Sequence, residues 1–460
     1  MNRIIVVLAA GKGTRMKSPR AKVLHPVLGR PMLTRLLSGL KALGAARTLV
    51  VVGHEQEVVS AVARGEGAET VLQEPQLGTG HALLMCKEIL ASVGQCEVLL
   101  VSGDVPLLPV ADLDRFWDKF HASKAPAGVV TLELGDPEGY GRIVRDHRGR
   151  VRRIVEHKDA SPEQRLLNEV NSGVYFFRSP MVFDLLDQLQ SSNAQGEYYL
   201  PDVVELAFAE QTPVLGWRAA EPALWLGVNS QAELARANEQ LRAAVVTGLM
   251  ESGVTVLMPE TVWVEPEAAV APGCLLHPYT RVCGASELGE GVEVRPFSCI
   301  AGSRLGAGTV VKEHSHIEGT EAGAGCILGP FCRTREGTLL AEGVHLGNFV
   351  ETKKAMLGRG VKANHLSYLG DATVGAGSNI GAGTITCNYD GVRKHPTVLG
   401  ERVFIGSDTQ LVAPVTVGDW AYIGAGTTVT KNVPAGALAI SRAPQKNIDG
   451  WVARKAPKKK

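Results

Sequence analysis

The chain has 460 residues, more than one ordinary core can hold, so two or three domains are expected. Its 48 Lys and Arg balance 47 Asp and Glu, so charge argues against nucleic acid or an anionic membrane as partner and favours small molecules. Eight scattered Cys without a CxxC pair, and no cationic stretch leading into a long apolar segment, predict a reduced, cytoplasmic protein without signal peptide or membrane span.

The first 230 residues alternate short apolar runs with helical patterns. Residues 4–8, 48–52 and 98–101 are almost continuously apolar, which is typical of strands in a sheet covered on both faces. Between the first two runs, Pro31 opens a segment whose apolar residues recur on one helical face as far as Leu43. This half is therefore predicted to be an α/β domain, Rossmann-like, with a mostly parallel sheet.

The pattern changes after residues 231–251, which predict one long connecting helix. Beyond it, aliphatic residues recur at every sixth position and Gly often follows them, which is typical of a hexapeptide repeat. The strongest run is Leu399, Ile405, Leu411, Val417, Ile423 and Val429. Weaker runs are Leu288, Val294, Ile300; Leu305, Val311, Ile317; Leu357, Ala363, Leu369; and Val374, Ile380, Thr386.

A six-residue period predicts a coil with three flat faces, in which a small aliphatic residue points inward on each face and Gly or another small residue occupies each corner. Stacked coils form a triangular prism of parallel strands. Its flat sides need covering, and threefold association of such prisms is the expected solution.

The stretch LAAGKGTRM, residues 8–16, follows the first predicted strand. It is not a Walker A loop, because neither Gly11 nor Gly13 starts that pattern, and it is not a dinucleotide fingerprint, because Met16 stands where a third Gly is required. Two Gly after a buried strand still let a polyanion approach the backbone, so a phosphate site is predicted. Three nearby cations favour it: Lys12, Arg15 and Lys22.

Longer strings extend this prediction. LAAGKGTRM followed by AKVLHP resembles the signature of sugar-nucleotide pyrophosphorylases, and LQEPQLGTGHA, SGDVPLL, GYGRIV, IVEHKDA, NSGVY and NAQGEYYLPD follow in the expected order. HLGNFVETKKA, KANHLSYLGDATVGAGSNIGAGTITCNYDG and FIGSDTQLVAPVTVG narrow the resemblance to the bacterial family of bifunctional N-acetylglucosamine-1-phosphate uridyltransferases and glucosamine-1-phosphate acetyltransferases. The resemblance covers nearly the whole chain.

This resemblance implies two reactions. Acetyl-CoA would acetylate glucosamine 1-phosphate, and UTP would then uridylate N-acetylglucosamine 1-phosphate with release of pyrophosphate, supplying peptidoglycan and lipopolysaccharide precursors. It also implies a left-handed β-helix, Mg²⁺ as cofactor and a homotrimer. The implied domains are a uridyltransferase domain at residues 1–229, a linker helix at 230–250 and an acetyltransferase β-helix with its tail at 251–460.

For uridyl transfer, the need to bring two anions together makes Arg15 and Lys22 the candidates for neutralising charge and aligning the phosphates. The resemblance implies that Asp104 and Asn229 hold Mg²⁺, an ion that needs few protein oxygens. The implied nucleotide and sugar contacts are Leu8, Ala9, Gly11, Lys22, Gln73, Gly78, Thr79, Gly141, Glu156, Asn171 and Asn229. Ser102 departs from the family pattern, where one form has Tyr.

For acetyl transfer, His365 matches the family's general base, and Asn388 is expected to orient either His365 or the substrate. Cations suit a phosphate monoester, and Glu336 departs from a relative's Pro. The implied sugar-phosphate contacts are Arg335, Lys353, Tyr368 and Asn379. The implied acetyl-CoA contacts are Ala382, Asn388, Tyr389, Ser407, Ala425 and Arg442.

Three other interpretations stay open at this point. The repeats could be only an oligomerisation module of a pyrophosphorylase, although this leaves NHLSYLGD and TCNYDG unexplained. The chain could be a non-catalytic trimeric scaffold that binds sugar nucleotides. A metal-dependent lyase on the same prism would need His ligands, for which His314 and His316 are the candidates, although solvated His residues fit that section better.

Overall fold

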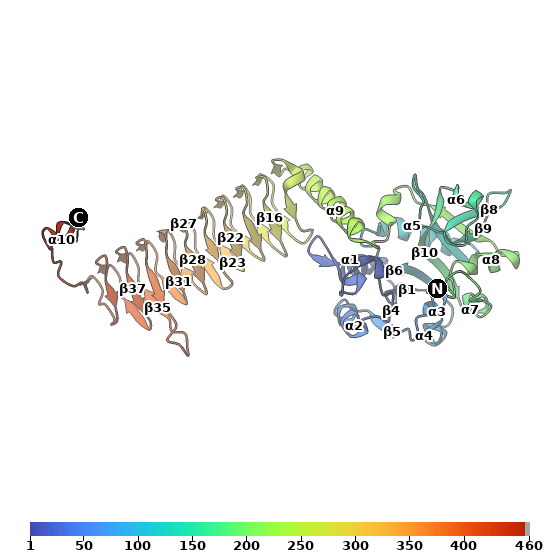
Figure 1. Ribbon diagram of the computed structural model, residues 1–460, viewed down its shortest axis with the longest axis horizontal. Coiled ribbons are helices and arrows are strands. Elements are labelled where there is room, and N and C mark those ends of the chain that lie inside the picture. Colours follow the sequence, from blue (N-terminus) through green and yellow to red (C-terminus); the bar gives the residue numbers. More distant parts are fainter. Residues whose placement is uncertain (456–460) are drawn as a thin grey trace, which may run out of the picture. The chain divides into compact units, whose positions relative to one another are not determined.

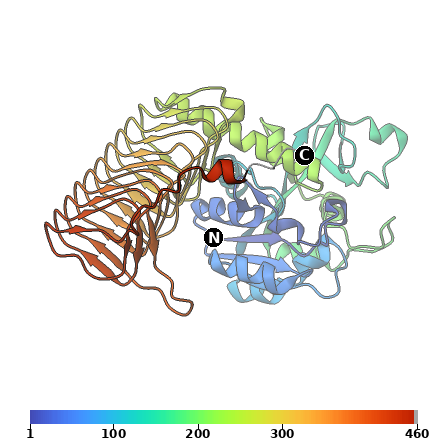
Figure 2. The same cartoon turned by 60° about the vertical axis from the view of Figure 1, so that its left-hand side comes forward.

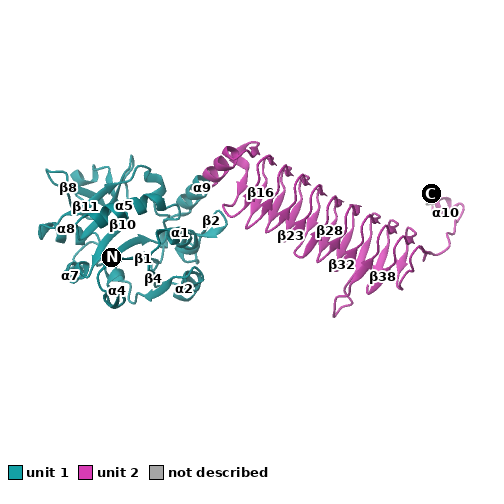
Figure 3. Ribbon diagram, turned by 180° about the vertical axis from the view of Figure 1, so that it is seen from behind, with its two compact units in different colours: residues 1–241 teal, residues 242–460 magenta. Residues whose placement is uncertain are grey.

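The computed structural model describes residues 1–455 and divides into two compact units (Figure 3). The first unit is Met1–Leu241, and the second begins at Arg242. The division falls within helix α9 (Gln231–Glu251), the long helix predicted from the sequence.

A nine-stranded sheet forms the centre of the first unit (Figure 1). Its main path runs β11-β7-β10-β6-β1-β4-β5, with β8 and β9 attached beside β10. The bounds are β1 (Asn2–Leu8), β4 (Arg47–Val52), β5 (Glu69–Leu72), β6 (Cys96–Ser102), β7 (Ala127–Glu133), β8 (Arg142–Arg145), β9 (Val151–Val155), β10 (Glu169–Ser179) and β11 (Val214–Arg218). Strands β6, β1, β4 and β5 are parallel neighbours, whereas β10 is antiparallel to β6 and β7. The predicted strands and the mostly parallel sheet are confirmed.

Both faces of this sheet are covered. Ile5 and Val7 of β1 belong to one hydrophobic cluster, and Ile4 and Val6 belong to another. The covering helices are α1 (Met32–Leu40), α2 (Gln56–Gly65), α3 (Thr79–Leu84), α4 (Lys87–Val93), α5 (Val110–Ala122), α7 (Met181–Leu186) and α8 (Asp202–Ala209), whereas α6 (Pro162–Arg165) has no buried residue. The helix expected from Pro31 to Leu43 is shorter: α1 starts after Pro31, and its last turn continues as a 3₁₀ helix, η3 (Lys41–Leu43).

The second unit is a parallel β-helix whose coils stack one on the next (Figure 2). Face 1 contains the sheet that runs from β12 (Thr255–Val256) to β41 (Leu438–Ala439). Face 2 runs from β13 (Trp263–Val264) to β40 (Thr428–Val429), and face 3 from β14 (Ala269–Val270) to β38 (Val415–Val417). Each described strand pairs in parallel with its counterpart in the next coil, for example β12 with β15 (Leu275–Leu276).

The burial of the inward residues confirms the predicted hexapeptide repeat. All six residues of the strongest run, Leu399 through Val429, are at most 4% exposed. The weaker runs are buried as well, Thr386 included. One continuous hydrophobic cluster extends along this unit, because each coil adds its three inward side chains to those of its neighbours.

The corner between faces 1 and 2 differs from the expected small residues. Five rings occupy it in successive coils with left-handed φ values of 54° to 60°, and neighbouring ring centroids lie 4.8 to 5.3 Å apart. We call this set the aromatic ladder: Tyr279, Phe297, His314, Phe331 and Phe349. Stacking between coils offsets the backbone strain of bulky residues at positive φ.

Within residues 1–455, no helix is long and apolar enough to cross a membrane. The same residues contain no cluster of three or more His, Cys, Asp and Glu side chains suited to a metal ion. His314 is stacked within the aromatic ladder, and His316 lies 3.8 Å from Glu318.

Candidate active sites

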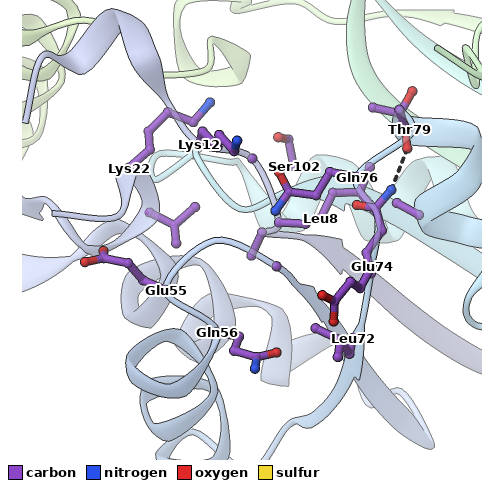
Figure 4. A pocket seen from close by; sticks show the side chains of 18 of the residues that line it. Leu8, Lys12, Lys22, Glu55, Gln56, Leu72, Glu74, Gln76, Thr79 and Ser102 are labelled. Atoms are coloured by element: carbon purple, nitrogen blue, oxygen red, sulfur yellow. Dashed lines mark hydrogen bonds between the residues drawn. The ribbon is translucent and has the colours of Figure 1, made fainter. Parts of the chain in front are cut away.

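The Gly-rich turn opens into a cavity of about 1130 Å³ at the carboxyl end of β1 (Figure 4). Gly13 has φ +59°, and a Cβ there would lie 2.6 Å from Cβ of Lys22, so the turn can run against the Lys22 stem only because residue 13 has no side chain. Predicted residues that line this cavity are Leu8, Ala9, Gly11, Lys12, Lys22, Gln73, Gly78, Thr79 and Asp104; Ser102 lines it too. Arg15 is exposed on η1 (Thr14–Met16), outside the described lining.

The loop that carries Gln73 and Gly78 forms another wall of the cavity. Gln73 is buried, and its Nε2 donates to the carbonyl of Gly78 at 2.9 Å and contacts Nδ1 of His81 at 3.2 Å. Burial lowers the pKa of His81, so a neutral ring accepts this hydrogen bond. The backbone of Tyr198 holds the loop through Leu77 and Gly80, with both hydrogen bonds at 2.8 Å. The Gln73 side chain is therefore held in one orientation.

Lys22, Asp104 and Asn229 come together although they are far apart in sequence. Lys22 Nζ forms an ion pair with Oδ2 of Asp104 and lies 3.1 Å from Oδ1 of Asn229. The backbone N–H of Val228 donates to the carbonyl of Asp104 at 2.9 Å, and that of Asn229 donates to Oε2 of Glu233 at 2.6 Å. These bonds fix the two oxygen donors around one point. A carboxylate and an amide oxygen are ligands that Mg²⁺ takes, so the residues fit the ion.

The three residues predicted to contact the sugar also meet. Gly141 precedes β8, Glu156 follows β9, and Asn171 lies in β10. The backbone N–H of Asn171 donates to the carbonyl of Gly141 at 2.8 Å, and a Cβ on Gly141 would lie 3.1 Å from Oε1 of Glu156. Burial raises the pKa of Glu156, and the charges of Asp159 and Asp202 raise it further. This acidic surrounding favours contact with sugar hydroxyls over contact with an anion.

Two residues behind this set were missed by the sequence analysis. Asn171 Nδ2 donates to the hydroxyl of the buried Tyr175 at 2.6 Å, while its Oδ1 accepts from the N–H of Gly173 at 3.0 Å. Burial raises the pKa of Asp202 to about 6, and Glu205 and Asp159 contribute. Tyr175 ends the quoted motif NSGVY and Asp202 ends NAQGEYYLPD, but only the fold shows that their side chains reach the sugar set.

In the second unit, the residues predicted to hold the sugar phosphate are aligned on face 2. Arg335 follows β25 (Arg333–Thr334), and Lys353 ends the neighbouring strand β28 (Glu351–Lys353). Arg335 lowers the pKa of Lys353, and so does Lys394, a cation that the sequence analysis did not single out. One carboxylate, Glu351, balances Arg335 at 3.1 Å. The remaining positive charge suits a phosphate monoester.

Tyr368 begins β31 (Tyr368–Gly370), the next strand on face 2. A Cβ on Gly370 would collide with the Tyr368 hydroxyl and would lie 2.8 Å from Nδ2 of Asn388, so Gly370 leaves room for both side chains. Asn388 is 7% exposed and donates to Oδ2 of Asp371 at 2.5 Å. Its bond is thus to Asp371.

His365 ends β30 (Lys362–His365) on face 1 and is exposed. Its Nδ1 lies 2.8 Å from Oδ1 of Asn348, the residue in register with it at the end of β27 (His345–Asn348). Because an amide oxygen only accepts, the ring donates from Nδ1 and keeps the Nε2 lone pair for a proton. The hydrogen-bond partner of the His365 ring is therefore Asn348 and not Asn388, and the string HLGNFVETKKA contains Asn348 without revealing this contact.

Three of the predicted acetyl-CoA contacts lie at the same corner as His365. Asn379 of β33 (Asn379–Ile380) pairs in register with Lys362, which places Ala382 in the coil position that His365 occupies one coil earlier. Registers in the next two coils place Ser407 and Ala425 at that position too. A guanidinium nitrogen of Arg442 would lie 3.6 Å from a Cβ on Gly424. Small side chains therefore follow His365 at this position in the next three coils.

Tyr389 lies off this corner. It is 61% exposed and donates from its hydroxyl to the carbonyl of Gly391 at 2.6 Å, within a short excursion from the coil. Asp390 stabilises this loop. Its Oδ1 accepts from the N–H groups of Val392 and Arg393, and its Oδ2 lies 2.7 Å from Nε2 of His395. Within this chain, Tyr389 is not brought next to His365 by any described contact.

Comparisons with known proteins find relatives for both halves of the chain. Residues 5–197 match the MobA-like NTP transferase domain, and residues 396–431 match the bacterial transferase hexapeptide family of six repeats. The chain is 45% identical to a protein of Pelobacter propionicus named "Bifunctional protein GlmU", over 98% of each chain. It is 47% identical to one of Nitratidesulfovibrio vulgaris, over 96% of this chain and 97% of the relative, and 44% identical to one of Heliobacterium modesticaldum, over 98% of each.

Proposed function

The chain belongs to the GlmU family of bifunctional proteins, and from that premise we propose which residues perform each of its two reactions. The chain is a bifunctional transferase of UDP-N-acetylglucosamine synthesis, with acetyltransferase and uridyltransferase activities that serve peptidoglycan formation. Uridyl transfer takes place in the cavity at the end of β1, and acetyl transfer at the corner that carries His365.

In acetyl transfer, Nε2 of His365 accepts a proton from the ammonium of glucosamine 1-phosphate, and the amine attacks the thioester carbonyl of acetyl-CoA. A C–N bond forms, the C–S bond breaks, and coenzyme A leaves as the thiol. Arg335, Lys353 and Tyr368 hold the sugar phosphate, with Asn379 beside them on face 1. The observation that carries this assignment is the His365–Asn348 hydrogen bond, because it leaves Nε2 unprotonated in the neutral ring.

Acetyl-CoA extends along the corner occupied by Ala382, Ser407 and Ala425, where small side chains leave space. Arg442 supplies a cation near the end of this path, suited to the phosphates of the coenzyme. Asn388 and Tyr389 complete the contacts from the excursion that follows β34 (Ile385–Cys387).

In uridyl transfer, a phosphate oxygen of N-acetylglucosamine 1-phosphate attacks the α-phosphorus of UTP, and the bond to pyrophosphate breaks. Arg15 and Lys22 neutralise the phosphates, while Leu8, Ala9, Gly11, Gln73, Gly78 and Thr79 enclose the nucleotide. Gly141, Glu156 and Asn171 hold the sugar. Asp104 and Asn229 would hold Mg²⁺, which neutralises phosphate charge when bound.

We further propose the assembly and the domain limits. The uridyltransferase domain comprises residues 1–229, the linker helix 230–250 and the acetyltransferase β-helix 251–460. The protein is a homotrimer located in the cytoplasm. An exposed apolar edge supports the trimer: Phe297, Phe331 and Phe349 of the aromatic ladder are 55%, 47% and 55% exposed, and Leu366 extends the ladder beside His365. Association along this edge would complete the acetyl-transfer site.

The test is a product assay on the full chain with glucosamine 1-phosphate, acetyl-CoA, UTP and Mg²⁺, in which free thiol and pyrophosphate are followed separately. We expect His365→Ala to lose thiol release while it still releases pyrophosphate from added N-acetylglucosamine 1-phosphate. Asp104→Asn and chelation of Mg²⁺ should have the opposite effect. Loss of both products in either variant would refute the two-site assignment.

A further inference from the structure

The ammonium of Lys22 lies between the two oxygens assigned to Mg²⁺. It forms an ion pair with Oδ2 of Asp104 and a 3.1 Å contact with Oδ1 of Asn229. The side chains of Lys22 and Asp104 are only 17% and 7% exposed, so water screens this pair weakly. Within residues 1–455, Lys22 is the one ion-pair partner of Asp104 and therefore supplies its counter-charge.

A metal ion and this ammonium cannot share the two oxygens in the observed arrangement. Both are cations, both would contact the same carboxylate and amide oxygens, and like charges at contact distance in a poorly screened site repel strongly. A divalent cation can therefore reach Asp104 and Asn229 only after the Lys22 side chain has moved. The backbone of Asp104 and Asn229 need not move, because the N–H groups of Val228 and Asn229 already hold it.

We propose that Lys22 holds the cation position in the nucleotide-free protein and yields it to the metal only when nucleotide phosphates give its ammonium a new partner. This inference rests on the proposed Mg²⁺ site and extends it. The protein alone then binds divalent cations poorly at Asp104 and Asn229, and metal and nucleotide each raise the affinity for the other.

The Gly-rich turn lies where bound phosphates could draw the Lys22 ammonium away from Asp104, and we call this replacement of the ammonium by the metal the exchange. Gly13 lies against the Lys22 stem, and Gly11 and Lys12 line the same cavity as Lys22 and Asp104. Phosphates bound to the turn would therefore approach the stem of Lys22. A long, flexible side chain can swing its ammonium from a carboxylate to a phosphate without a change in the backbone.

The experiment measures Mn²⁺ binding to the nucleotide-free full chain, with free Mn²⁺ followed by electron paramagnetic resonance. We expect Lys22→Met to bind Mn²⁺ at least tenfold more tightly than the unmodified protein, and Lys22→Gln to behave in the same way should Lys22→Met not fold. Adding Asp104→Asn to Lys22→Met should abolish the gain. Lys12→Met is the matched control, because it removes an equal charge from the same cavity without touching Asp104, and it should change the affinity less than threefold.

Equal Mn²⁺ affinity in the Lys22 variants and the unmodified protein would overturn the exchange, as would an equal gain in Lys12→Met. Failure of the Mg²⁺ assignment itself has a different signature. In that case the unmodified protein would release pyrophosphate without a divalent cation, and Asp104→Asn would not alter its metal requirement.

Discussion

At the scale of single residues, the pair of His365 and Asn348 makes a direct prediction. Asn348→Ala removes the acceptor for Nδ1, so both tautomers of His365 become populated and kcat for acetyl transfer should fall about tenfold to a hundredfold. Uridyl transfer should not change. The measurement is kcat for each reaction across pH.

Asn348→Asp is the matched control for this prediction. Its carboxylate still accepts from Nδ1 and also favours the charged ring, so most activity should remain while the acid limb of the pH profile moves to higher pH. A merely structural role for Asn348 would leave that limb where it is in both variants.

Asp202 makes a prediction about stability and pH. Burial raises the pKa of Asp202 to about 6, so the native state binds its proton more tightly than the unfolded state does. The free energy of unfolding should therefore decrease as pH rises from about 4 to about 6, and the decrease persists above that range. Asp202→Asn should raise the thermal midpoint of the first unit at pH 8 but not at pH 4, as measured by scanning calorimetry. An equal effect at both pH values would contradict this account.

The sequence motifs were sufficient to identify Lys22, Asp104, Asn229 and His365 as candidate site residues, but they could not predict the hydrogen bonds and ion pairs that these residues form. The Lys22–Asp104 pair joins residues 82 positions apart, and the His365–Asn348 pair depends on the register of two strands 17 residues apart. Such pairings follow from the closed fold and not from any local pattern. For this reason the sequence left open whether Asn388 orients His365 or the substrate, whereas the structure gives its side chain Asp371 as partner.

At the scale of elements, the loop around Gly78 depends on a conformation that other residues rarely adopt. Gly78 has φ +103°, and a Cβ there would lie 2.8 Å from the carbonyl oxygen of Tyr198. Gly78→Ala should raise KM for UTP about tenfold or more while acetyl transfer is retained. Gly65→Ala is the control, because a Cβ at that position of α2 meets nothing within 4 Å. Unchanged KM in Gly78→Ala would show that the loop tolerates displacement.

The coils of the β-helix offer a second element-scale test. Leu411 is fully buried, so Leu411→Ala should lower the free energy of unfolding of the second unit by about 2–5 kcal/mol. The side chain of the neighbouring Gln410 in β37 (Gln410–Val412) does not point inward. Gln410→Ala should therefore change the free energy of unfolding by less than about 0.5 kcal/mol. Urea titrations of the two variants give the comparison. Equal losses would mean that the coil does not distinguish inward from outward positions.

The inward positions of the coils could be predicted because a six-residue period repeats in the sequence. The aromatic ladder could not, because its rings lie 17 or 18 residues apart and belong to a corner where small residues are the usual choice. The end of α1 also differed from expectation. Its apolar periodicity continues to Leu43, but the last turn tightens to 3₁₀ before Gly44, which takes the left-handed conformation.

At the scale of the whole molecule, the proposed trimer predicts that the two activities separate on dissociation. A double variant, Phe331→Glu with Phe349→Glu, places charge on the exposed ladder and should shift the protein from trimer to monomer. Acetyl transfer should be lost with the trimer while uridyl transfer continues. Sedimentation combined with both assays makes the measurement, and a monomer that retains acetyl transfer would contradict the proposal.

The corner that begins with His365 places side chains at fixed, equal spacings along the β-helix. His365, Ala382, Ser407 and Ala425 occupy one position in four successive coils, and strands in a sheet are about 4.8 Å apart, so this edge measures about 14 Å in three equal steps. Gain or loss of a coil between His365 and Ala425 lengthens or shortens the distance between them by one whole step, because each coil packs in the same way on the next. A β-helix can therefore be matched to acyl donors of different length only in discrete increments, never continuously.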